Sequence, residues 1–332
     1  MHNFTIFANK YMNMSGNGQR KKALLIEKYC KKTSEIHFVS AEGREFQIMD
    51  AFICPICLNI IKKEDSDIIT IEDVPPKSVG GRPLLITCQP CNNVVGGSIE
   101  SFLHNELQVF HLVRNPEDIP FKAEYTLNGV KIKGRVKIKS IEDHEILCTI
   151  DSNDINNCPI FTQELEHNWD GSNLEIKYDL TSVKRNDEYA NLSILKSAYL
   201  LAFAKLGYMY ILNDNLDPIR DQLQNPDMDV LKNSFLIAKG VEILQDLKDG
   251  VYYGYVENIY CVLVVMTFKL KKKNALKHRA VVALPTPEAK DYSLYSQLSK
   301  MPNNKTMSII KEAEELPLEP IFAIVEWDQL KK

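Results

Sequence analysis

Four cysteines in two short-spaced pairs are the residues of this chain whose types and spacing most clearly indicate chemistry. The pairs are Cys54-Pro-Ile-Cys57 and Cys88-Gln-Pro-Cys91. Four thiolates in this pattern can close a tetrahedral zinc site, and the segment between the pairs is long enough for a β-hairpin. Zinc held by four cysteines has no open position for water. We therefore expect a structural zinc, with any catalysis carried by residues inside this cysteine clamp.

The segment enclosed by the clamp resembles the HNH, or ββα-metal, nuclease motif. In that family an acidic residue, a histidine and a nearby proline end the first strand, a glycine-rich hairpin follows, and Cys-x-x-Cys-Asn opens the metal-binding helix. The matching runs here are Glu72-Asp73-Val74-Pro75-Pro76, Gly80-Gly81 and Cys88-Gln89-Pro90-Cys91-Asn92. The resemblance covers residues 54 to 105. More loosely, residues 198 to 212 resemble the helical part of bacterial HNH endonuclease-like proteins.

The resemblance implies a role for each of these polar residues. Glu72 occupies the first metal-ligand position and Asn92 the second, so together they would hold Mg²⁺ or Mn²⁺ against a scissile phosphate. Hard oxygen ligands with an incomplete shell suit such an ion. Lys77 and Arg82 lie in the same segment, where we expect them near the phosphate.

The position that holds the general-base histidine in the family is Asp73 here, and the interior asparagine that orients that histidine falls near Pro83. A histidine with a pKa of about 6.5 activates water well at neutral pH, whereas an exposed aspartate, at about 3.9, is a weak base. Asp73 is therefore a base with a raised pKa, an additional metal ligand, or the mark of a site that kept its fold and lost hydrolysis. His104 and His111 are two helical turns apart, and we expect them on a helix surface.

The elements around the clamp follow from hydrophobic spacing. Residues 35 to 48 predict a hairpin, and residues 97 to 113 predict a helix with Ser98 as its cap. Residues 121 to 138 alternate on either side of Asn128-Gly129, which is a strong hairpin signal.

The C-terminal half predicts helices followed by strands. Helices are expected over 185–206, from Asp217-Pro218 with the aspartate as cap, and over 228–238. Strands are expected over 260–270 and 277–284, and a last strand over 320–327 is expected to join the same sheet.

These elements predict an α+β protein with a zinc-clamped ββα-metal module followed by a larger mixed region. The expected divisions are residues 1–118, with the module core at 50–112, a β-rich unit at 119–182, and a helical then β-stranded region at 183–332. A chain of 332 residues fits two or three such units.

Composition limits the function classes. With a net charge of −4, the chain has no overall positive charge that would by itself indicate nucleic-acid binding. The remaining cysteines, Cys30, Cys148, Cys158 and Cys261, are scattered, and we expect buried free thiols. The apolar run at 198–204 is too short to span a membrane, and the N-terminus lacks a secretory signal pattern, so we expect a cytoplasmic protein without membrane contact.

Local basic stretches at 20–32, 131–139 and 269–279 could contact phosphate. In the second stretch, alternation places a basic stripe on one side of a strand: Lys131, Lys133, Arg135, Lys137 and Lys139. A solvated edge strand explains such a stripe equally well.

The leading hypothesis is an HNH-like, metal-dependent endonuclease that hydrolyses phosphodiester bonds of nucleic acid, with DNA as the expected form, in antiviral defence or restriction. The alternative is a catalytically inactive zinc-ribbon module that binds nucleic acid or a protein partner in a defence complex.

Overall fold

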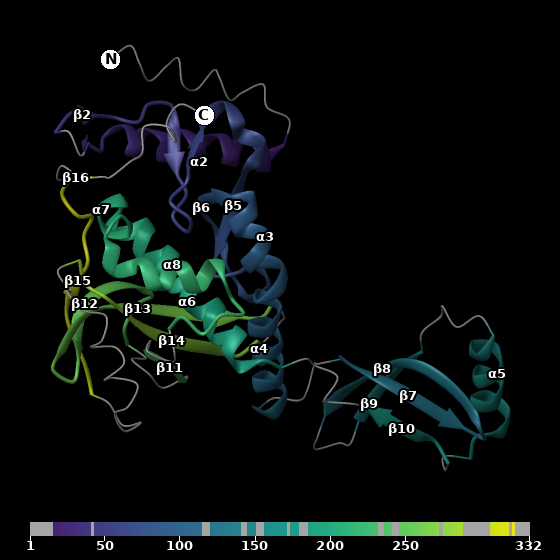
Figure 1. The fold of residues 1–332 in the computed structure, drawn as a ribbon. Coiled ribbons are helices and arrows are strands. Elements are labelled where there is room, and N and C mark those ends of the chain that lie inside the picture. Colours follow the sequence, from purple (N-terminus) through teal and green to yellow (C-terminus); the bar gives the residue numbers. More distant parts are fainter. Residues whose placement is uncertain are drawn as a thin grey trace. The chain divides into compact units, whose positions relative to one another are not determined.

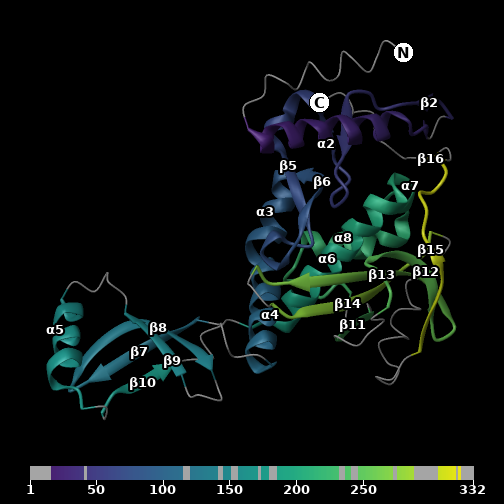
Figure 2. The same ribbon diagram turned by 180° about the vertical axis from the view of Figure 1, so that it is seen from behind.

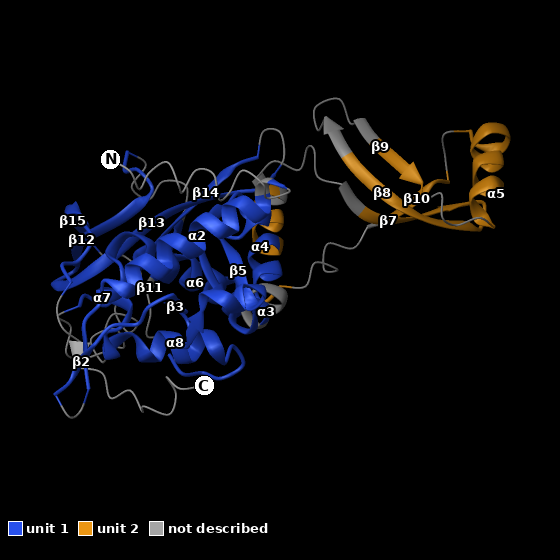
Figure 3. Ribbon diagram, turned by 90° about the horizontal axis from the view of Figure 1, so that it is seen from above, with its two compact units in different colours: residues 1–104, 187–332 blue, residues 105–186 orange. Residues whose placement is uncertain are grey.

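The structure is a computed structural model of the chain. It describes residues 16–40, 43–114, 120–140, 145–150, 156–170, 173–178, 185–231, 236–240, 246–271, 275–287, 306–318 and 321–322. The fold is mixed α and β, as the sequence predicts. Two compact units divide the chain, one containing residues 1–104 and 187–332 and the other residues 105–186 (Figure 3). The N-terminal and C-terminal segments thus fold together in the first unit.

The N-terminal part of the first unit carries the cysteine clamp. Its elements are α2 (Asn17–Ser34), β1 (Phe38–Val39), β2 (Glu45–Phe46), β3 (Ala51–Ile53), β4 (Ile60–Lys62), β5 (Ile69–Val74), β6 (Arg82–Cys88), α3 (Gln89–Ser98) and the start of α4 (Glu100–Arg114), whose remainder from residue 105 belongs to the second unit. β5 and β6 pair antiparallel, and α3 follows β6 without a break. Figure 2 shows this hairpin beside α3. The order β5, β6, α3 is a ββα unit.

The C-terminal part of the first unit is a five-stranded antiparallel sheet covered by helices. Its strands, in spatial order, are β11 (Leu236–Gly240), β14 (Lys277–Leu284), β13 (Ile259–Lys269), β12 (Gly250–Val256) and β15 (Met307–Glu312). α6 (Asp187–Leu206) packs on β12, β13 and β14, and α7 (Tyr208–Ile211) and α8 (Asp217–Gln224) follow it (Figure 1). The helix predicted over 185–206 is confirmed by α6, in which Leu195, Tyr199 and Phe203 are buried.

The second unit is built on a four-stranded antiparallel sheet. Its strands, in spatial order, are β10 (Glu175–Tyr178), β7 (Pro120–Leu127), β8 (Val130–Ser140) and β9 (Glu145–Ile150). The hairpin predicted at Asn128-Gly129 is confirmed, and both residues have positive φ, 48° and 83°. α5 (Asn157–Gln163) packs on β8.

Several predicted elements differ from the structure. One helix was expected over 97–113, with Ser98 as its cap. In the structure Ser98 is the last residue of α3, and a separate helix, α4, begins at Glu100. The helix expected over 228–238 is wrong, because residues 236–240 form β11 and pair with β14. Pairing with β14, which is buried from His278 to Leu284, has overridden the local helical spacing there.

Two further expectations are corrected near the ends of elements. The residue capping α8 is Leu216, and Asp217 lies inside the helix, where its carboxylate pairs with Arg220. The last strand, β16 (Ile321–Phe322), pairs in parallel with β1 and not with the five-stranded sheet. Residues 323–327 of that predicted strand lie outside the described residues.

Candidate metal centre

The four cysteines of the clamp converge on one point. The Sγ atoms of Cys54, Cys57, Cys88 and Cys91 all lie within 4.8 Å of one another, and those of Cys57 and Cys88 are 3.8 Å apart. Tetrahedral zinc with Zn–S bonds of about 2.3 Å requires sulfurs about 3.8 Å apart. The geometry and the all-thiol donor set fit a metal such as zinc.

Each cysteine is placed by the end of an element. Cys54 follows β3, and Cys57 lies in the tight turn that brings the chain to β4, where Leu58 adopts a positive φ of 57°. Cys88 is the last residue of β6, and Cys91 lies in the first turn of α3. The backbone N–H of Cys88 donates to Sγ of Cys54 over 3.5 Å, which links the two pairs directly.

The thiols influence one another's ionisation. Hydrogen bonds from Cys54 lower the pKa of Cys57 and of Cys88, whereas burial raises the pKa of Cys54. Metal ligation requires all the thiols as thiolates. A bound metal cation would supply the positive charge that keeps four closely spaced thiolates ionised.

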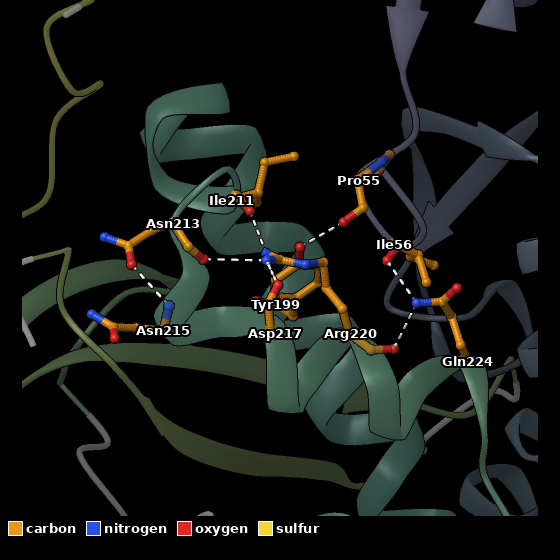
Figure 4. A network of polar contacts seen from close by, with 9 residues as sticks. All are labelled: Pro55, Ile56, Tyr199, Ile211, Asn213, Asn215, Asp217, Arg220 and Gln224. Carbon is orange, nitrogen blue, oxygen red and sulfur yellow. Dashed lines mark hydrogen bonds and ion pairs between the residues drawn. The ribbon is translucent and has the colours of Figure 1, made fainter. Parts of the chain in front are cut away.

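The turn between Cys54 and Cys57 is held by helices that lie more than 100 residues later in the chain (Figure 4). The hydroxyl of Tyr199 donates to the carbonyl of Pro55 over 2.5 Å, and Nε2 of Gln224 donates to the carbonyl of Ile56 over 3.4 Å. Just before the turn, the hydroxyl of Tyr208 donates to the carbonyl of Ile53 over 3.1 Å. These donors come from α6, α8 and α7, so the helical layer fixes the first half of the clamp.

Arg220 holds that helical layer together. Its buried guanidinium donates to the carbonyls of Ile211 and Asn213 and pairs with the carboxylate of Asp217 (Figure 4). These contacts tie the end of α7 to α8. No sequence pattern marked Arg220, because its partners are mainly backbone carbonyls in a loop.

Glu72, expected as a metal ligand, is a buried member of an ion pair. Only 3% of Glu72 and 1% of Lys196 are exposed, and Lys196 Nζ lies 2.7 Å from Glu72 Oε1. Oε2 of Glu72 accepts from the hydroxyl of Thr87 over 3.3 Å. Lys196 also lies 2.8 Å from Oε1 of Glu100, at the start of α4. Both oxygens of Glu72 therefore have protein partners.

Burial and charge act in opposite directions on this group of residues. Burial raises the pKa of Glu72, and the ammonium of Lys196 opposes this rise. Burial tends to lower the pKa of Lys196, but the carboxylates of Glu72 and Glu100 outweigh it, and its pKa is raised. Lys196 is thus held as a cation.

Asp73 occupies a different environment from its neighbour. A register shift interrupts the β5–β6 ladder between Glu72 and Asp73, and Asp73 lies opposite Pro83. Its side-chain atom Oδ1 is buried without a hydrogen-bond partner. A buried carboxylate oxygen without a partner is costly, and a cation is one way to satisfy it. Asn92 is half-buried near the start of α3, directly after the clamp.

The end of the hairpin exposes the two predicted phosphate-binding residues. Lys77 begins a short 3-10 turn (Lys77–Val79), Arg82 begins β6, and both are exposed. The backbone of the loop approaches itself closely at Gly81. A Cβ there would lie 1.4 Å from the carbonyl oxygen of Pro75, so only glycine fits. Both cations are accessible to a ligand.

The two histidines of α4, His104 and His111, differ in part from expectation. His104 is half-buried, and His111, expected on a helix surface, is buried. Among the residues that the structure describes, the four cysteines form the one cluster of at least three His, Cys, Asp or Glu side chains able to hold a metal ion.

Comparison with known proteins adds no assignment, since no protein-family model, curated protein or solved structure matches the chain. Among the described helices, none is both long enough and apolar enough to cross a membrane.

Proposed function

We propose that this protein is a zinc-clamped ββα endonuclease of the HNH type that hydrolyses phosphodiester bonds of nucleic acid, with DNA as substrate, in antiviral defence or restriction. The observation that carries the proposal is the position of the clamp. Its cysteines join the end of β6 and the start of α3 to the turn after β3, so that Asp73 on β5 and Asn92 on α3 belong to one metal-stapled ββα unit.

The contacts of Glu72 and Asp73 in the structure change which residues we assign as ligands of the catalytic ion. Asp73 and Asn92 are the oxygen donors assigned to a Mg²⁺ or Mn²⁺ ion, and such an ion, when bound, stabilises charge on the departing oxygen. Glu72 is committed to Lys196 and Thr87, so it acts by positioning β5 against α6. Lys77 and Arg82 are exposed cations that can neutralise the phosphate.

The alternative function is a non-catalytic zinc module that binds nucleic acid or a protein partner in a defence complex. The Glu72–Lys196 pair favours it, because a ligand position filled by an internal ion pair does not need a second metal ion. This alternative and the nuclease proposal predict the same zinc and differ in chemistry.

Cleavage of supercoiled plasmid by the zinc-loaded protein with Mg²⁺ or Mn²⁺ tests the proposal. Wild type should nick the plasmid, and Asp73→Ala and Asn92→Ala should each reduce the rate at least about 100-fold, since each removes an ion ligand. Asp67→Ala removes an exposed carboxylate outside the hairpin ends and should leave the rate unchanged.

Restoring the family's histidine tests the ligand role assigned to Asp73 against a role as general base. If Asp73 is the base, Asp73→His retains or raises the rate at neutral pH. If Asp73 is an ion ligand, Asp73→His loses most of it. Absence of cleavage with every divalent ion would favour the non-catalytic module, whereas equal cleavage in Asp73→Ala and wild type would refute the role assigned to Asp73.

A further inference from the structure

The sheet of the second unit has one apolar and one polar face. Ala123, Tyr125, Ile132 and Val136 form a core with Phe161 of α5. Gly134 belongs to the same face, where a Cβ would lie 2.1 Å from the carbonyl oxygen of Thr149. Successive strand residues alternate between faces, so the odd-numbered positions of β8 lie on the opposite side from α5.

That opposite face is strongly basic. The register places even-numbered positions of β7 and odd-numbered positions of β8, β9 and β10 on it. The charged residues on it whose side chains the structure describes are six basic and two acidic: Lys122, Lys131, Lys133, Arg135, Lys137 and Lys177, with Glu124 and Glu175. We call these residues the basic sheet face. The chain as a whole has a net charge of −4, so positive charge is concentrated here.

The position of β8 within the sheet removes the simplest structural explanation for its lysines. Charged side chains on edge strands prevent edge-to-edge pairing. β8 is an interior strand, hydrogen-bonded to β7 on one side and to β9 on the other. Its row of cations therefore has no edge to protect. Two exposed ion pairs among the described residues of this face, Lys131–Glu124 and Lys177–Glu175, contribute little stability.

The chemistry of the face fits a phosphate backbone. Lys131, Lys133 and Arg135 are exposed and recur every second residue, about 6.8 Å apart. Proteins that bind single strands add aromatic side chains on which bases stack. Among the described outward positions of this sheet, none is aromatic, and Thr126 and Thr149 supply hydroxyl groups between the cations. Phosphate contacts of this kind hold a duplex without reading its sequence.

We propose that the basic sheet face binds the phosphate backbone of a nucleic-acid duplex and supplies most of the chain's affinity for it. The inference rests on the proposed function only for the class of partner, and it concerns binding, not cleavage. The shared chemistry is that of duplex DNA and duplex RNA, which the test separates.

Salt-dependent binding by the full-length protein tests this proposal. The zinc-loaded Asp73→Ala protein, without added divalent ions, is titrated with a labelled 30-base-pair DNA duplex, the matching RNA duplex and each single strand. The added triple change Lys131→Gln/Lys133→Gln/Arg135→Gln should weaken duplex binding at least about tenfold and reduce the slope of log K against log salt by about three.

The matched control is Lys62→Gln/Lys248→Gln/Lys311→Gln, which removes three positive charges from exposed sites of the first unit. It should leave affinity and slope near the parent values. Thermal unfolding of both triple variants checks that they fold. Equal slopes in the two variants, or tighter binding of single strands than of duplex, would overturn the proposal. Slope loss without plasmid cleavage by wild type would uphold it and refute the nuclease.

Discussion

Glu72 and Lys196 form a buried ion pair, 2.7 Å long, that joins β5 of the clamped hairpin to α6 of the C-terminal helical layer. The pair is completed by Glu100 at the start of α4, 2.8 Å from the same ammonium. Three segments that are far apart in the sequence therefore meet at one cation. If one of these elements moved away, a charged side chain would stay buried without its partner, which is costly. The stability of each of the three elements therefore depends on the other two.

Removing the cation should be strongly destabilising. Lys196→Met leaves Glu72 buried without its charged partner, and we expect a loss of about 3–5 kcal/mol in the free energy of unfolding, measured by urea denaturation. Lys205→Met, which breaks the exposed pair with Glu312, is the control and should change stability by less than about 1 kcal/mol.

The double variant Lys196→Met/Glu72→Leu separates the ion pair from packing. It buries no uncompensated charge at position 72, so it should recover much of the stability lost in the single variant. A double variant as unstable as Lys196→Met alone would show that the lysine acts through its packing or through Glu100.

The sequence predicted the parts of this arrangement that depend on neighbouring residues. Two Cys-x-x-Cys pairs were enough to predict the clamp, and Asn128-Gly129 was enough to place a hairpin. Each Cys-x-x-Cys pair and the Asn-Gly dipeptide is a pattern confined to a few neighbouring residues. Lys196 carried no such signal. It lies in an apolar helical segment, and its partners come from residues about 100 or more positions earlier.

The same reason explains which details were missed or wrong. β11 and β16 are short, and their state is set by pairing with distant strands, β14 and β1, not by local spacing. Tyr199 is a buried residue of a helix that the sequence predicted, but the contact of its hydroxyl with the clamp is not encoded by helical periodicity. Basic alternation on β8 was visible, whereas its interior position was not.

Metal removal should expose how much the clamp contributes to the fold. We expect one zinc per chain by elemental analysis, and a chelator should lower the melting temperature, because binding energy at such a site is folding energy.

Cys57→Ser should lose most of the zinc, whereas Cys148→Ser, at an exposed thiol outside the clamp, should retain it. Zinc affinity should fall as pH falls, since protons compete for the thiolates. A full zinc complement in Cys57→Ser would contradict the assignment.

The hydroxyl of Tyr199 should couple the helical layer to the metal. Tyr199→Phe keeps the buried ring and leaves the carbonyl of Pro55 without its donor, which should cost about 1–3 kcal/mol of stability. Because that carbonyl lies between Cys54 and Cys57, we also expect faster zinc transfer to a colorimetric chelator under native conditions. Tyr255→Phe removes the hydroxyl of an exposed tyrosine and is the matched control. If the two variants release zinc at the same rate, α6 supports the fold without positioning the clamp.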